Sequence, residues 1–125
     1  MIERLTSVAR RHRPLRLLIL FGSRARGTAG EHSDWDLAYV ADDALDPDVL
    51  LADLVTALRS ERVDLVDLAR AGGQLRFRVA RDGQVVHARD ADEFHRFWLD
   101  AVSFWCDAAP VIGAGYAEVI ERLRR

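Results

Sequence analysis

The chain has little cysteine and no lysine: Cys106 is the single cysteine, and all 18 basic residues are arginine. One cysteine cannot form an internal disulfide, so a hydrophobic core must stabilise the fold, which suits a reducing compartment such as the cytoplasm. Cys106 has no activating partner in the sequence, and we interpret it as a packed apolar residue rather than a nucleophile. The lack of lysine is a compositional bias, so no arginine is assigned a function from its type alone.

Long hydrophobic runs and a charge excess are also missing. The longest apolar stretch near the N-terminus, residues 15–21, is interrupted by Arg16. It is too short to span a bilayer and lacks a signal-peptide cleavage pattern. The formal net charge of −2 argues against general binding of nucleic acid, which favours basic proteins. We therefore expect a cytoplasmic protein that neither enters a membrane nor takes nucleic acid as its main partner.

The chain does have enough residues for one compact domain. Its 125 residues, half of them hydrophobic, can bury a core without disulfides. We predict a single α/β domain over residues 1–125, with an α/β core over 1–90 and C-terminal helices over 91–125.

Hydrophobic periodicity and turn residues predict the order of the elements. Residues 75–80 fit either a helix or a strand. Asp46, followed by Pro47, has the pattern of a helix N-cap. The other expected elements are a helix over 1–11, strands over 15–22, 34–41 and 63–68, a helix after Asp46, a short strand after Gly83, and helices from Asp92 and Ile112.

The first half of a candidate active site is Gly22-Ser23 at the end of the first strand. Glycine lets the backbone turn sharply, and Ser23 would then begin a short helix whose free N–H groups attract an anion. Arg24 and Arg26 lie in the same turn and could neutralise phosphate charge. This half of the pattern indicates a phosphate-binding turn.

The second half is Asp34-Trp35-Asp36, ten residues after Ser23. Alternation along a strand puts Asp34 and Asp36 on one face, with backbones roughly 6.6–6.8 Å apart. Two carboxylates so placed repel each other unless a cation lies between them, and Mg²⁺ prefers such oxygen ligands together with substrate phosphates. Two such ions can clamp both oxygens of a phosphoryl displacement. The combination predicts transfer of part of a nucleoside triphosphate.

Simpler interpretations remain for both halves. Residues 22–33 could be an ordinary loop, and the two aspartates could lie on a solvated strand face. A Walker-type phosphate loop is excluded, because Thr28 occupies the position of its lysine.

The pattern Gly22-Ser23, ten residues, Asp34-x-Asp36 resembles the signature of the DNA polymerase β-type nucleotidyltransferase superfamily. The phrase FGSRARGTAGEHSDWDLAYV is similar to the minimal nucleotidyltransferases, and the resemblance extends through residues 63–68, about two-thirds of the chain. It implies a nucleotidyltransferase fold with a small mixed β-sheet flanked by helices and a helical C-terminal extension.

The resemblance also implies roles for individual residues. Gly22 and Ser23 would hold the triphosphate of ATP, while Asp34 and Asp36 would bind two Mg²⁺ ions. A third carboxylate on a neighbouring strand would complete the metal shell and help deprotonate the attacking hydroxyl. Asp64 matches that position best. Asp67 is the alternative, and the two face opposite sides of a strand, so only one can reach the site.

The family precedent implies an antitoxin that transfers AMP from ATP to a hydroxyl group, typically of a tyrosine, on a HEPN-type toxin. Two alternatives stay open at this point. The protein could neutralise its partner by binding alone, or it could modify a small molecule or an RNA end.

Other features have less specific interpretations. The C-terminal aromatic side chains could close the core or bind a partner or a second copy of the chain. The acidic residues at 42–48 are expected to form a loop and a helix cap, and the arginines at 10–16 a solvated basic edge that could contact a toxin or RNA. The four histidines lack metal-ligand spacing. The histidines are His12, His32, His87 and His95, and the acidic residues are Asp42, Asp43, Asp46 and Asp48. The arginines are Arg10, Arg11, Arg13 and Arg16, and the C-terminal aromatic residues are Phe94, Phe97, Trp98 and Trp105.

Overall fold

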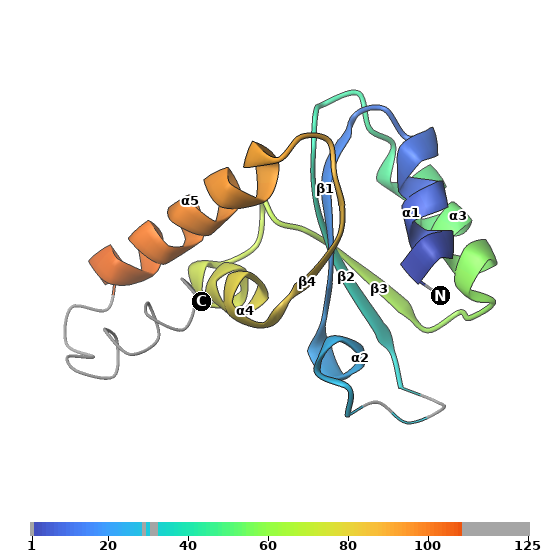
Figure 1. Cartoon of the computed structure of the whole chain (residues 1–125), viewed down its shortest axis with the longest axis horizontal. Helices are drawn as coiled ribbons and strands as arrows, with labels where there is room; N and C mark the ends of the chain where they lie inside the picture. The colour runs from blue at the N-terminus through green and yellow to red at the C-terminus, as the bar shows by residue number, and fades with distance from the viewer. Residues whose placement is uncertain (1, 29, 31–32, 109–125) are drawn as a thin grey trace.

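A computed structural model describes residues 2–28, 30 and 33–108 of the chain (Figure 1). The expected helix from Ile112 lies outside these residues. Within them, no helix is both long and apolar enough to cross a membrane. The elements in order are α1 (Ile2–Arg11), β1 (Leu15–Phe21), α2 (Gly22–Arg26), β2 (Trp35–Ala41), α3 (Pro47–Leu58), β3 (Val63–Asp67), α4 (Gly73–Asp82), β4 (Gln84–Ala88) and α5 (Asp92–Ala108).

The four strands form one mixed sheet in the order β3-β2-β1-β4. Strand β1 runs antiparallel to both β2 and β4, whereas β2 and β3 are parallel. Parallel neighbours need a crossover connection, and α3 supplies it between β2 and β3. The sheet is therefore small and mixed, as the resemblance implied.

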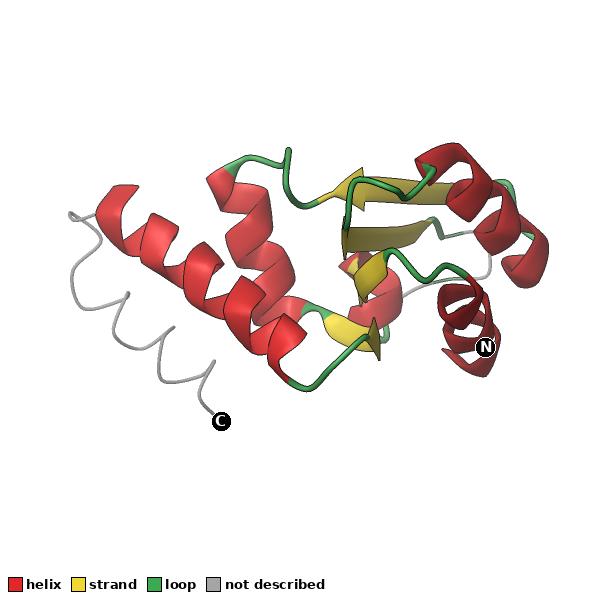
Figure 2. Cartoon of the chain, turned by 90° about the horizontal axis from the view of Figure 1, so that it is seen from above, coloured by secondary structure: helices red, strands yellow, loops and turns green. Residues whose placement is uncertain are grey.

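Helix pairs cover the two faces of the sheet. Figures 1 and 2 show α1 and α3 on one face and α4 and α5 on the other. Side chains of β2 alternate between the two cores: Trp35 and Leu37 pack with α1 and α3, whereas Ala38 packs with α4 and α5. The predicted alternation of residues 34–41 is confirmed, although the regular strand begins only at Trp35.

Helix α3 begins as the sequence predicted. The Asp46 side chain accepts hydrogen bonds from the backbone N–H groups of Asp48 and Val49, at 3.0 and 3.4 Å, and Pro47 is the first helical residue. These bonds satisfy N–H groups that have no partner inside the helix.

The ambiguous residues 75–80 belong to helix α4. Phe77 and Ala80, three positions apart, are buried on one side of it. Gly83 ends the helix where the chain passes close to the core: a Cβ there would collide with the Ile19 side chain and the Val79 carbonyl. The expected strand follows at once as β4.

Helix α5 both closes a core and leaves apolar surface exposed. Phe97 and Ala101 are buried against the sheet, and Trp98 is partly buried in the same cluster. Leu99 and Phe104 are 45% and 53% exposed. The aromatic pattern after Asp92 thus contributes Phe97 and Trp98 to the protein's own core and leaves Phe104 exposed.

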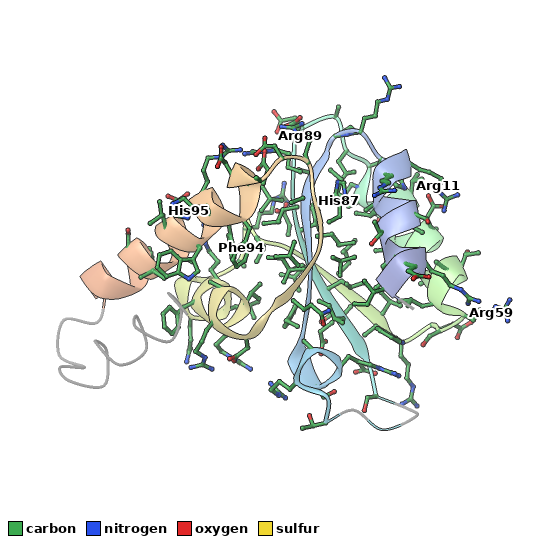
Figure 3. The ribbon with its side chains drawn as sticks, in the orientation of Figure 1. Arg11, Arg59, His87, Arg89, Phe94 and His95 are labelled. Atoms are coloured by element: carbon green, nitrogen blue, oxygen red, sulfur yellow. The ribbon has the colours of Figure 1, made fainter. Side chains whose placement is uncertain are left out.

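A cluster of ionised side chains lies at the end of the sheet away from α2, where Figure 3 labels Arg89. Its centre is Glu93, whose side chain is 2% exposed. Arg16 donates to both Glu93 carboxylate oxygens at 3.1 and 3.2 Å, and Arg96 and Arg89 lie 2.9 and 3.6 Å from Oε1. We call these four residues the Glu93 cluster.

Candidate active site

The site begins where β1 ends, at Gly22. Its φ of +73° is in the left-handed region that glycine adopts without strain. A Cβ at this position would overlap the carboxyl group of Asp36. Glycine is therefore required twice, for the turn and for the close approach of the Asp36 carboxylate to the backbone.

Ser23 lies in the first turn of the five-residue helix α2. The helix ends at Gly27, which is left-handed with a φ of 73° and whose N–H donates to the Ser23 carbonyl. Thr28 N–H donates to the same carbonyl at 3.0 Å. The turn is closed by its own backbone, and N–H groups in a first helical turn have no acceptor within the helix.

The three predicted acids come together at this end of the sheet. Asp36 is paired with Phe21 of β1 on one side and with Asp64 of β3 on the other. Paired residues in adjacent strands lie about 4.8 Å apart and point to the same face. Asp34 precedes the strand by one residue. It is two positions from Asp36, a spacing that puts both side chains on the same face of an extended segment.

Electrostatics single out Asp36 among the three. It is partly buried, whereas Asp34 and Asp64 are exposed. Burial raises the pKa of the Asp36 carboxyl group, the Asp64 and Asp34 carboxylates raise it further, and, among the described residues, Arg26 alone lowers it. Three negative groups thus converge with little compensation, which is a common property of functional sites.

Asp67 lies elsewhere. It pairs with Tyr39, which packs in the core under α1 and α3, on the face opposite Asp36. Its Oδ1 accepts a hydrogen bond from Ala69 N–H at 2.9 Å and so closes the turn after β3. Of the two candidates for the third carboxylate, the structure brings only Asp64 to the other acids.

The two arginines of α2 have different surroundings. Arg26 is exposed and interacts with Asp36 and with Asp82 of α4. Arg24 places its guanidinium 4.1 Å from the centre of the Trp35 ring, and its Nη2 donates to the Ser33 carbonyl at 2.9 Å. The Trp35 ring belongs to the core under α1 and α3, whereas Asp36 lies on the opposite face of β2. Nothing in the sequence pattern separated these two arginines.

A divalent cation fits the donor set of this site. Among the residues that the structure describes, no three Asp, Glu, His or Cys side chains form a ready-made metal site. Mg²⁺ commonly uses only one or two carboxylates and takes its other ligands from water and phosphates. Asp34, Asp36 and Asp64 offer such carboxylates, and their repulsion around Asp36 is what a cation relieves.

A separate cavity of about 250 Å³ lies at the Glu93 end, lined by Val40, Arg76 and Phe97 among others. None of the three acids contributes to it. The three acids lie at the other end of the sheet, beside α2.

Comparisons with known proteins agree with this geometry. The family model described as "Polymerase beta, Nucleotidyltransferase" matches residues 3–92. A protein adenylyltransferase MntA from Aphanizomenon flos-aquae is 34% identical over 95 residues, covering 66% of this chain and 63% of the relative. A second MntA, from Shewanella oneidensis, is 39% identical over 82 residues, covering 63% and 58%. The match thus spans less than two-thirds of these curated relatives.

Solved structures match over almost the whole chain. A crystal structure of a toxin–antitoxin with AMP-PNP has a TM-score of 0.75 and 29% identity, covering 95% of this chain and 98% of that one. The structure of a tri-AMPylated Shewanella oneidensis HEPN toxin in complex with its MNT antitoxin has a TM-score of 0.67 and 26% identity, covering 96% and 99%.

Proposed function

This chain belongs to the polymerase beta nucleotidyltransferase family, and from that premise we propose that it transfers AMP from ATP to a hydroxyl group of a HEPN-type toxin. The acceptor hydroxyl is that of a tyrosine, and the modification silences the toxin in the cytoplasm. The MntA relatives bear the name protein adenylyltransferase, and a similar solved complex contains an AMPylated HEPN toxin.

The observation that supports the proposal is the convergence of three acids beside Gly22. Asp36 is held against the Gly22 backbone, and Asp64 is its neighbour in the sheet. The α2 turn offers N–H groups and Arg26 to the triphosphate. Two Mg²⁺ ions bound by the carboxylates would neutralise triphosphate charge.

The residues divide the reaction between them. The toxin hydroxyl oxygen forms a bond to the α-phosphorus of ATP, and the bond from that phosphorus to the bridging oxygen breaks, so pyrophosphate leaves. Asp64 accepts the proton of the hydroxyl group. Ser23 and Arg26 orient the phosphates, and Gly22 keeps the turn close to Asp36.

The test is AMP transfer in vitro. The protein is incubated with Mg²⁺, a HEPN-type toxin, and ATP labelled on either the α- or the γ-phosphate. We expect the α-label on a toxin tyrosine and no transfer of the γ-label. Asp36→Ala should abolish transfer, whereas Asp43→Ala, an exposed acid in the β2–α3 loop, should leave it unchanged. Full transfer by Asp36→Ala would contradict the assigned site.

A second candidate function is neutralisation by binding alone. Exposed Leu99 and Phe104 on α5 favour it, because such side chains are suited to a protein interface or a homo-oligomer. Protection of toxin-expressing cells by Asp36→Ala would support binding, and its loss would support catalysis. If the α-label instead appears on RNA or a small molecule, the acceptor differs but the chemistry stands.

A further inference from the structure

Asp34 differs from the other two acids because it lies outside the regular sheet. Strand β2 begins at Trp35, so no strand pairing fixes Asp34. Ser33 before it is held by Gly30, whose N–H donates to Ser33 Oγ at 2.8 Å. Trp35 after it donates its N–H to the Arg62 carbonyl at 2.8 Å. The position of Asp34 thus depends on its two neighbours.

Arg24 contacts both of those neighbours. Its Nη2 donates to the Ser33 carbonyl at 2.9 Å, and its guanidinium carbon lies over the Trp35 ring, 4.1 Å from the ring centre. Trp35 is itself 9% exposed and packed in the core. One side chain from α2 therefore connects the phosphate turn to the residues on both sides of Asp34.

We propose that Arg24 is a positioning residue that fixes Asp34 relative to Gly22 and Ser23. It acts through Ser33 and Trp35 rather than by contact with the nucleotide, since its guanidinium lies on the Trp35 side of the sheet. The catalytic consequence rests on the proposed function, whereas the structural consequence does not.

The chemistry of arginine explains why this position differs from Arg26. A planar guanidinium can stack on an aromatic ring and donate within its own plane at the same time. A lysine ammonium is a compact charge that cannot make both contacts. Lysine keeps the positive charge that neutralises a phosphate. It would not keep both the contact with the Trp35 ring and the hydrogen bond to the Ser33 carbonyl.

Kinetics of Arg24→Lys and Arg26→Lys separate these roles. For Arg24→Lys we expect kcat to fall by about 10- to 100-fold, as for other residues that support metal ligands, with the KM for ATP changed by less than about twofold. Arg26→Lys, at a residue proposed to orient the phosphates, should show its loss mainly as a higher KM for ATP. Exposed Arg4 on α1 provides a neutral control as Arg4→Lys. A wild-type kcat in Arg24→Lys would overturn the proposal, and so would a rise in its KM for ATP without a fall in kcat.

Hydrogen exchange tests the positioning without any activity. In Arg24→Lys the Trp35 amide should exchange about tenfold faster than in wild type, as expected for loss of a cation–π contact, while the Ala38 amide in the same strand should be unaffected. Unchanged protection of Trp35 would overturn the proposal even if activity fell. If wild type transfers no AMP, the proposed function fails, and the exchange result still decides the role of Arg24.

Discussion

The two ends of the sheet place carboxylates in opposite electrostatic environments. At the α2 end, Asp34, Asp36 and Asp64 converge, and the pKa of Asp36 is raised by burial and by the other two acids. At the other end, Glu93 is more deeply buried yet faces three guanidinium groups within 3.6 Å. Compensated charge of the second kind supports the fold. Charge of the first kind, which Arg26 compensates only in part, lowers stability, as expected where a cation and substrate must bind.

The strongest contrast should come from Asp36→Asn, which removes charge but little volume. We expect AMP transfer to fall by about a thousandfold, as when a central electrostatic group is removed. The same change should raise the melting temperature by a few degrees. A folded-state pKa above 3.8 means that ionised Asp36 destabilises the fold at neutral pH. Thermal unfolding and the labelled-ATP assay measure the two effects, and a lower melting temperature would contradict the interpretation.

Gly22→Ala should damage the same end by geometry instead of charge. The new Cβ would overlap the Asp36 carboxyl group, so the carboxylate must move, and the backbone φ of +73° is strained for alanine. We expect about a hundredfold loss of activity from such a displacement and a cost of about 1–2 kcal/mol in the free energy of unfolding. Gly27→Ala has the same φ but open space around the Cβ. It should lose a similar amount of stability and much less activity.

Asp64→Asn and Asp67→Asn test which acid of β3 belongs to the site. If Asp64 accepts the hydroxyl proton, its substitution should lower kcat at least about a hundredfold. Asp67→Asn should change kcat by less than about threefold, because Asp67 closes a turn on the other face. Equal kcat values for the two variants would refute the assignment of Asp64.

Glu93→Gln should produce the opposite outcome to Asp36→Asn. Removing the carboxylate leaves three arginines without their shared partner, and we expect a loss of about 2 kcal/mol in unfolding free energy. This is less than for a fully buried pair, because the arginine side chains are 30–52% exposed. Below the melting temperature the variant should transfer AMP normally. Denaturant unfolding provides the measurement, with exposed Glu61→Gln as the control.

The smallest expected effect is a pH dependence from His87 on β4, labelled in Figure 3. Burial lowers its pKa below 6.5, nearby Arg10 lowers it further, and a hydrogen bond with the Leu15 backbone partly opposes them. The unfolded chain therefore binds the proton more readily than the folded protein. The neutral His87 side chain therefore favours the folded state. Its contribution to the free energy of unfolding is fully present above pH 6.5 and is lost as the pH falls toward the folded-state pKa. His87→Gln should flatten the slope of unfolding free energy against pH in this range, and an unchanged slope would exclude His87 as the cause.

Much of this site was readable from local patterns. Alternation put Asp34 and Asp36 on one face, and glycine at position 22 marked the turn. The choice between Asp64 and Asp67 was not readable, because it depends on the register between β2 and β3. Residues 75–80 stayed ambiguous because a short apolar segment suits either a helix or a strand until its neighbours are known. The Glu93 cluster gave no sequence signal, since Arg16 and Glu93 are 77 positions apart.

The sequence by itself determined the features that depend on near neighbours along the chain: the Asp46 cap, the period of each element and the paired acids of the second strand. Only the tertiary structure decided which charges meet. It placed Asp64 beside Asp36, turned Arg24 toward Trp35 and Arg26 toward the acids, and surrounded Glu93 with arginines. Charge interactions depend on distance in space, and for residues far apart along the chain that distance is set only when the sheet and its helices pack.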